Sequence, residues 1–158
     1  MAKVLVVYYS QTGNTEKMAK AIESAIRKEG VEVVSKRVED TSAEEFLNYE
    51  GIIIGSPCYY GTMAYPIKKL IDESVKFHGR IVGKVGGAFC SAGNIGGGAE
   101  TVILSILEAL LIHGMIVQGE PRGAHYGPVA IGTPDEKALK GCEKLGKSVA
   151  NLVKKLFP

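Results

Sequence analysis

The segment from Val4 to Tyr9 is an uninterrupted apolar run rich in Val and Tyr. Such a run is typical of a strand in a parallel sheet, because helices cover both faces of that sheet. The segment from Gly51 to Ser56 contains three consecutive isoleucines and has the same character. Between the two runs, residues 14–29 carry apolar side chains at helical spacing, and Gly30 follows as a helix terminator. This start predicts a parallel sheet with helices on its faces.

The same alternation continues to the end of the chain. Further strands are expected at residues 31–38, at 82–90, and in two halves of an edge strand at 115–119 and 129–131. Further helices are expected at residues 63–77 and 100–113. A short helix is expected from the capping box at 41–44 toward Tyr49. A closing helix is expected from a second capping box at 133–136, with Pro134 as first helical residue, to Leu156. Together these elements predict one α/β domain over residues 1–158, with a five-stranded parallel sheet in the order 2-1-3-4-5. A ligand would then lie beyond the carboxyl ends of the strands.

Composition excludes several classes of protein. The formal net charge of +2 is too small to indicate nucleic acid or an anionic membrane as partner. The three cysteines are widely spaced without a CxxC pair, which excludes a disulfide framework and a cysteine zinc site and fits a reducing cytoplasm. No apolar run approaches the roughly 20 residues of a membrane span. We expect a cytoplasmic protein with no membrane insertion and no metal site.

The loop after the first strand offers hydroxyl groups and one glycine where a helix begins. A helix amino terminus presents free N–H groups and a partial positive charge, which suit a phosphate. Neither GxxxxGK[ST] nor GxGxxG is present, so the loop favours a monophosphate over a nucleoside triphosphate or a dinucleotide. The alternative is that these side chains only cap the helix. The candidate phosphate ligands are Ser10, Gln11, Thr12, Gly13, Asn14 and Thr15.

Two further loops follow the third and fourth strands. Two adjacent tyrosines in the first could flank a flat aromatic ring, or could cover the end of the sheet. The second is rich in glycine, which costs chain entropy on folding and suggests backbone N–H groups that approach a ligand; a plain turn is the alternative. The candidate ring-binding residues are Pro57, Cys58, Tyr59, Tyr60 and Gly61 in the first loop, and Ser91, Ala92, Gly93, Asn94, Ile95 and Gly96 in the second.

The helix at 100–113 is apolar on almost all sides, which suggests a subunit interface in addition to the core. His113 ends this helix, where it could favour the helix dipole or act at a bound cofactor. His125 lies in the insert of the edge strand and could assist proton transfer, although a lone loop histidine is usually only solvated.

Four motifs carry a family resemblance. They are residues 9–15 (YSQTGNT), Gly55-Ser-Pro57 with Gly61-Thr-Met-Ala64, Ser91-Ala-Gly93 with Gly97-Gly-Ala-Glu-Thr101, and His113-Gly-Met115. Together they resemble the flavodoxin-like superfamily, and within it the tryptophan-repressor-binding-protein (WrbA) group of FMN-dependent NAD(P)H:quinone oxidoreductases and the short flavodoxins. The resemblance covers nearly the whole chain.

The resemblance implies a flavodoxin-like three-layer sandwich with FMN as cofactor and NAD(P)H as possible co-substrate. It implies that residues 10–15 bind the phosphate, that Cys58, Tyr59 and Tyr60 lie alongside the ring, and that residues 91–96 bind the ring edge and ribityl chain. His113 matches a histidine that approaches the flavin across a subunit contact, as a catalytic residue of a homodimer or homotetramer.

The sequence departs from the quinone reductases in lacking Trp, which they carry near the active site. Phe77, His78 or His125 could take its place. Two functions therefore stay open. One is an oxidoreductase that moves two electrons from NAD(P)H to a quinone-like acceptor. The other is a one-electron carrier between protein partners, which the basic character of the chain, with a pI near 8.4, disfavours because such carriers are typically acidic.

Overall fold

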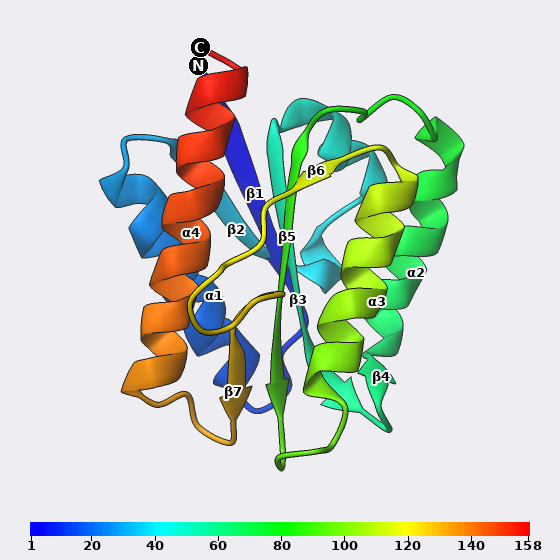
Figure 1. The fold of residues 1–158 in the computed structure, drawn as a ribbon. Coiled ribbons are helices and arrows are strands. Elements are labelled where there is room, and N and C mark those ends of the chain that lie inside the picture. The colour runs from blue at the N-terminus through cyan, green and yellow to red at the C-terminus, as the bar shows by residue number, and fades with distance from the viewer.

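The apolar runs form the centre of a parallel sheet in the computed structural model, which describes residues 1–158 (Figure 1). The main strands are β1 (Lys3–Tyr8), β2 (Glu32–Arg37), β3 (Gly51–Tyr59), β5 (Val85–Ala92) and β6 (Ile116–Val117), in the order β2-β1-β3-β5-β6. β7 (Val129–Ile131) pairs in parallel with the carboxyl end of β5, whereas β6 pairs with its beginning. The expected order 2-1-3-4-5, with an edge strand in two halves, is confirmed.

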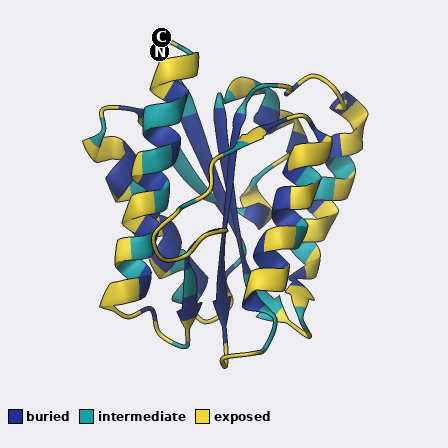
Figure 2. Ribbon diagram, in the orientation of Figure 1, coloured by how far each residue is buried: buried dark blue, intermediate teal, exposed yellow.

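Helices cover both faces of the sheet, as Figure 1 shows. α1 (Asn14–Lys28) and α4 (Glu136–Leu156) lie on one face, and α2 (Tyr65–Glu73) and α3 (Ala99–Ile112) lie on the other. Each face has its own core of buried apolar side chains, which Figure 2 shows as dark strands between helices with exposed outer sides. The strands are thus buried on both faces, as their unbroken apolar runs require.

The first and last helices are in close contact at Gly146 of α4. A Cβ atom there would lie 2.6 Å from the backbone oxygen of Ile22 and 3.0 Å from Cβ of Ala25, both on α1. Glycine costs helix stability in an isolated helix, but here it allows the two backbones to approach. α4 therefore packs directly on the helix whose first turn follows the Ser10–Thr15 loop.

Several expected boundaries were wrong. β5 begins at Val85, not Val82, because Val82 is exposed and Gly83 takes a positive φ of 81° in the preceding turn. α4 begins at Glu136 with Asp135 as its cap, whose Oδ1 accepts the N–H of Ala138 at 2.8 Å, so Thr133 and Pro134 precede the helix.

The remaining corrections concern the segments around β3. The short helix is the 3₁₀ helix η2 (Ala43–Asn48), and its capping box uses Ser42 and Glu45. β3 runs on to Tyr59 and returns through β4 (Thr62–Met63) as a hairpin, where a loop was expected. The helix expected at 63–77 is divided into α2 and the 3₁₀ turn η3 (Ser74–Phe77); one more 3₁₀ turn, η1 (Val38–Asp40), follows β2.

No helix is long and apolar enough to cross a membrane. No group of three or more His, Cys, Asp or Glu side chains is placed to hold a metal ion.

Candidate functional site

Three loops lie together at the carboxyl ends of β1, β3 and β5, the lower edge of the sheet in Figure 1. One hydrogen bond joins each pair of loops. Thr15 Oγ1 and Ser91 Oγ are 2.8 Å apart, Tyr59 Oη donates to Gln11 Oε1 at 3.0 Å, and Cys58 Sγ donates to the Gly97 carbonyl at 3.2 Å. The structure thus brings together the three segments that the sequence singled out.

The first loop leaves two of its backbone donors without a partner. Ser10 is buried, and its Oγ accepts the N–H groups of Gly13 at 3.2 Å and Glu16 at 3.3 Å, so this hydroxyl holds the loop rather than facing solvent. Gly13 has a φ of +99°, which glycine adopts without strain. The backbone N–H groups of Gln11 and Thr12 have no partner in the chain, and the first turn of α1 adds donors that lack a helical acceptor. The loop is therefore suited to an anion.

The contact between Thr15 and Ser91 is buried, although 76 residues separate the two in sequence. Both side chains are almost fully enclosed, with exposed fractions of 2% and 6%. This contact links the first turn of α1 to the end of β5. Thr15 and Ser91 therefore fix the loops relative to each other.

The second loop presents its tyrosines differently. The Tyr59 ring meets Tyr9 edge to face at 6.2 Å, and burial raises the pKa of its hydroxyl. Tyr60 is fully exposed and, with a φ of +50°, is the one residue other than glycine with positive φ. Strained backbone of this kind gathers at ligand sites. The hairpin therefore holds Tyr59 in place and leaves the Tyr60 ring free.

The third loop is exposed at its tip and closely packed against the hairpin at Gly98, just before α3. Residues 93–96 are exposed, including the Ile95 side chain. At Gly98, a Cβ atom would lie 2.8 Å from the Gly61 Cα, so glycine is required for the close approach to the hairpin. The tip is thus open to solvent, while the end of the loop is held against the hairpin.

Arg37, at the end of β2, is a residue of this edge that sequence reasoning missed. Its guanidinium donates to the Ser10 carbonyl and lies 5.9 Å from the centre of the Tyr8 ring. The Ser10–Thr15 loop contains no Lys or Arg, and phosphate binding was expected from its own groups alone. The structure adds a cation, which binds the Ser10 carbonyl. The sequence could have indicated this, because β2 was expected beside β1 and the carboxyl ends of neighbouring parallel strands lie at the same edge of a sheet.

His113 lies at the other end of the molecule from these loops. α3 starts beside the third loop and runs back for 14 residues, about 20 Å, so that His113 precedes β6 near the start of β5. Ser74 Oγ donates to the Ile71 carbonyl at 2.6 Å and therefore accepts from His113 Nε2 at 2.7 Å. The Phe77 ring stacks on the imidazole at 5.9 Å, and the buried Nδ1 has no partner. Within one subunit His113 cannot reach a ligand held by the three loops.

Two of the three proposed replacements for Trp lie with His113, away from the loops. Phe77 is buried against His113, and the His78 ring lies 5.7 Å from it. His125 is exposed, and its Nδ1 lies 2.7 Å from the Glu120 carbonyl in the segment between β6 and β7.

Comparison with known proteins identifies the fold family. The profile of the family described as flavodoxin matches residues 6–93. The chain belongs to the flavodoxin family. A protein of Archaeoglobus fulgidus named NAD(P)H dehydrogenase (quinone) is 36% identical over 99% of this chain and 100% of its own. A flavodoxin of Clostridium saccharobutylicum is also 36% identical, over 98% of this chain and 99% of its own. Among solved structures, a WrbA-like flavodoxin from Agrobacterium tumefaciens has a TM-score of 0.83 at 22% identity, covering 98% of this chain and 99% of that one.

Membership of the flavodoxin family implies a flavin-binding redox protein, and the loops fit that group. The unpartnered N–H groups of Gln11 and Thr12 and the exposed Thr12 hydroxyl match a phosphate. The exposed tyrosine hairpin and the open glycine loop lie next to it, where the ring system of the same molecule would have to lie. The agreement with a flavin phosphate thus depends on donors that make no hydrogen bond within the chain.

The hydrogen bond between Thr15 and Ser91 should be measurable as stability of the flavin-free protein. We expect Thr15→Val to lower the free energy of unfolding by about 1–3 kcal/mol, because it leaves the buried Ser91 hydroxyl without its partner. The Thr15→Val/Ser91→Ala double variant should lose less than the sum of the single variants. The control is Thr12→Val in the same loop, where the exposed hydroxyl has no partner and the change should stay within about 0.5 kcal/mol. Additive losses in urea unfolding would contradict the coupling.

His113 should make the folded state sensitive to acid. Burial, and then the nearby His78, lower the pKa of His113 below its ordinary value. The unfolded state, in which a histidine has a pKa of about 6.5, then binds the proton more readily than the folded state does. The contribution of His113 to folding stability is therefore full above about pH 6.5 and is lost as the pH falls below that value. The urea midpoint should drop between about pH 7.5 and about pH 5.5, and less so in His113→Gln. His125→Gln is the control and should keep the full drop; equal drops in all three proteins would refute the assignment.

Proposed function

We propose that the three loops bind FMN and that the protein is an NAD(P)H-dependent oxidoreductase that reduces quinone-like acceptors by two electrons. The observation that carries the FMN assignment is the Ser10–Thr15 loop. It combines a helix amino terminus, unpartnered backbone N–H groups and an exposed threonine hydroxyl, without the lysine that a triphosphate site uses.

The ring of FMN is assigned to the space beside Tyr59 and Tyr60 and the loop at 91–96. Aromatic side chains stack on a flat ring in offset or edge arrangements. The glycine-rich backbone, which has few side chains to hold it away, can donate N–H groups to the polar edge of that ring. When bound, FMN supplies the electron transfer, while the chain binds and orients it.

Two observations favour the enzyme over the carrier. The net charge of +2 is unlike that of acidic electron carriers, and the relative named NAD(P)H dehydrogenase (quinone) aligns over its whole length. The carrier remains the second candidate, because a flavodoxin of the same identity aligns equally well.

A role for His113 at the flavin requires a second subunit. The exposed apolar side chains of Leu104, Leu111 and Ile112 on α3 offer a face for such a contact, and burial of apolar surface is the common driving force of association. We therefore keep the homodimer or homotetramer, with His113 approaching the flavin of a neighbour, as part of the proposal.

The phosphate assignment can be tested with two ligands that differ only in the phosphate. Thr12→Val should weaken binding of FMN about tenfold to a hundredfold, because a hydrogen bond to a charged group is lost. It should leave the affinity for riboflavin unchanged, because riboflavin lacks the phosphate. Flavin fluorescence titrations of the wild type and the variant measure both affinities. Equal weakening of the two ligands would show that Thr12 does not contact the phosphate.

The reaction can be tested by mixing the FMN-loaded protein anaerobically with NADH or NADPH and a benzoquinone. We expect bleaching of flavin absorbance with the nicotinamide alone, and continued nicotinamide oxidation once the quinone is added. The matched control is the same mixture with free FMN at the same concentration. Absence of nicotinamide oxidation, together with reductive titration in two separate one-electron stages, would favour the carrier.

A further inference from the structure

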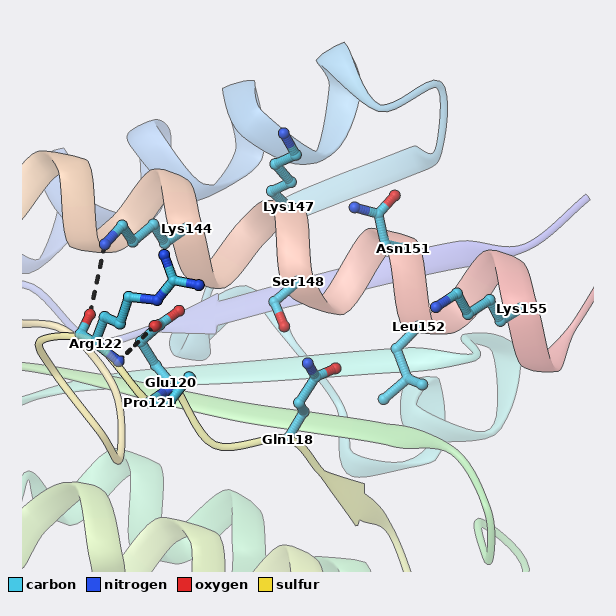
Figure 3. Close-up of a pocket in the computed structure, with 10 residues that line it drawn as sticks. All are labelled: Gln118, Glu120, Pro121, Arg122, Lys144, Lys147, Ser148, Asn151, Leu152 and Lys155. Carbon is cyan, nitrogen blue, oxygen red and sulfur yellow. Dashed lines mark hydrogen bonds between the residues drawn. The ribbon is translucent and has the colours of Figure 1, made fainter.

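A groove of about 480 Å³ lies between α4 and residues 118–122, the segment that leads from β6 toward β7 (Figure 3). Gln118 and Ser148 approach it from opposite walls, and Leu152 is its one apolar lining residue. The groove starts well along α4: Lys144 lies eight residues, about 12 Å, beyond the first residue of the helix. It is therefore on the flank of the sheet, away from the three loops.

The positive charge of the protein is concentrated in this groove. Four cationic side chains and one carboxylate line it, which gives a net charge of +3, whereas the whole chain carries +2. The rest of the molecule is therefore slightly negative. The cations are Arg122, Lys144, Lys147 and Lys155, and the carboxylate is Glu120.

Three of these four cations form no ion pair within the chain. No carboxylate pairs with Arg122, Lys144 or Lys155, and Lys147 reaches only Glu29 Oε1 at 3.9 Å. Lys140, one turn earlier on the same helix but outside the groove, pairs with Glu136 at 3.0 Å. The side chains of Gln118, Ser148 and Asn151 also make no hydrogen bond in the chain, so three neutral polar groups add to the free donors of the groove.

The wall that carries Arg122 is held in shape. The Glu120 N–H donates to the His125 carbonyl at 3.1 Å, and His125 Nδ1 lies 2.7 Å from the Glu120 carbonyl. The Glu120 carboxylate accepts the Arg122 N–H at 2.8 Å, and Lys144 Nζ donates to the Arg122 carbonyl at 3.5 Å (Figure 3). These bonds hold the backbone of Arg122 beside Lys144, while its guanidinium makes no hydrogen bond within the chain. The two cations face one space.

The geometry points to a binding site for a small ligand that carries two or more phosphate groups. Arginine matches a phosphate with paired donors, and lysines add point charges. The lysines at 144 and 147 are almost one turn, about 4.5 Å, apart along α4, so neighbouring phosphates of one chain can each meet a lysine. The volume is in the range of small-molecule pockets. Because four of the ten lining side chains are cationic, the phosphates would provide most of the binding.

The test is a titration of the full-length protein, ¹⁵N-labelled, with inorganic triphosphate and, separately, with ADP. Backbone amide signals of residues 118–123 and 144–155 should shift with saturation. Arg122→Gln and Lys144→Gln should each weaken binding at least about tenfold. The control Lys137→Gln removes the same charge from an exposed position on α4 outside the groove, and should change affinity less than about twofold.

Three results would overturn the proposal. Shifts confined to residues 10–15 would place the anion at the first loop instead. Equal losses in Lys137→Gln and Lys144→Gln would indicate a diffuse field rather than a site. Tighter binding of a poly-glutamate peptide than of either phosphate ligand would identify an acidic protein surface as the occupant. If triphosphate and ADP bind equally, the phosphates alone are recognised; tighter binding of ADP adds the nucleoside to the ligand.

Discussion

The burial of the parallel sheet on both faces is the constraint on which the rest of the structure depends. Neighbouring parallel strands require a crossover, and each crossover here is long enough to pack a helix or a loop on the sheet. The strands β1, β3 and β5 therefore point the same way, and the segments that follow them meet at one edge. The candidate site forms at this edge because the three strands that precede its loops are parallel neighbours. These loops are residues 10–15, 57–61 and 91–98.

The sequence allowed the strand order and the three loops to be predicted because both depend on local patterns. Unbroken apolar runs mark buried strands, and glycine or hydroxyl clusters mark the turns after them. Boundaries were less predictable where two local signals competed. At the start of α4, Thr133 with Pro134 resembles a helix start, but the carboxylate of Asp135 caps the helix two residues later. At β3, the apolar run ends at Ser56 and a loop was expected after it, yet pairing with β4 carries the strand to Tyr59.

The contacts that shape the site could not be predicted in this way, because they join residues far apart in sequence. No local pattern indicates that Thr15 meets Ser91, or that Cys58 meets the Gly97 carbonyl. Arg37 is different, since the expected neighbourhood of β1 and β2 was enough to bring it to the first loop. For His113, the sequence indicated a helix end correctly, and the structure adds that its imidazole is enclosed by Ser74 and Phe77 on the far side from the loops.

The contact at Gly146 has a consequence for how the protein matures. The phosphate-suited loop is synthesised before any of the sheet's later strands, whereas α4, the helix that packs on α1, follows all of them. Until α4 has left the ribosome, the apolar side of α1 that it covers, with Ile22 at its centre, is in contact with water. The helix that follows the Ser10–Thr15 loop therefore reaches its final packing only after α4, more than 100 residues later in the chain, has been made.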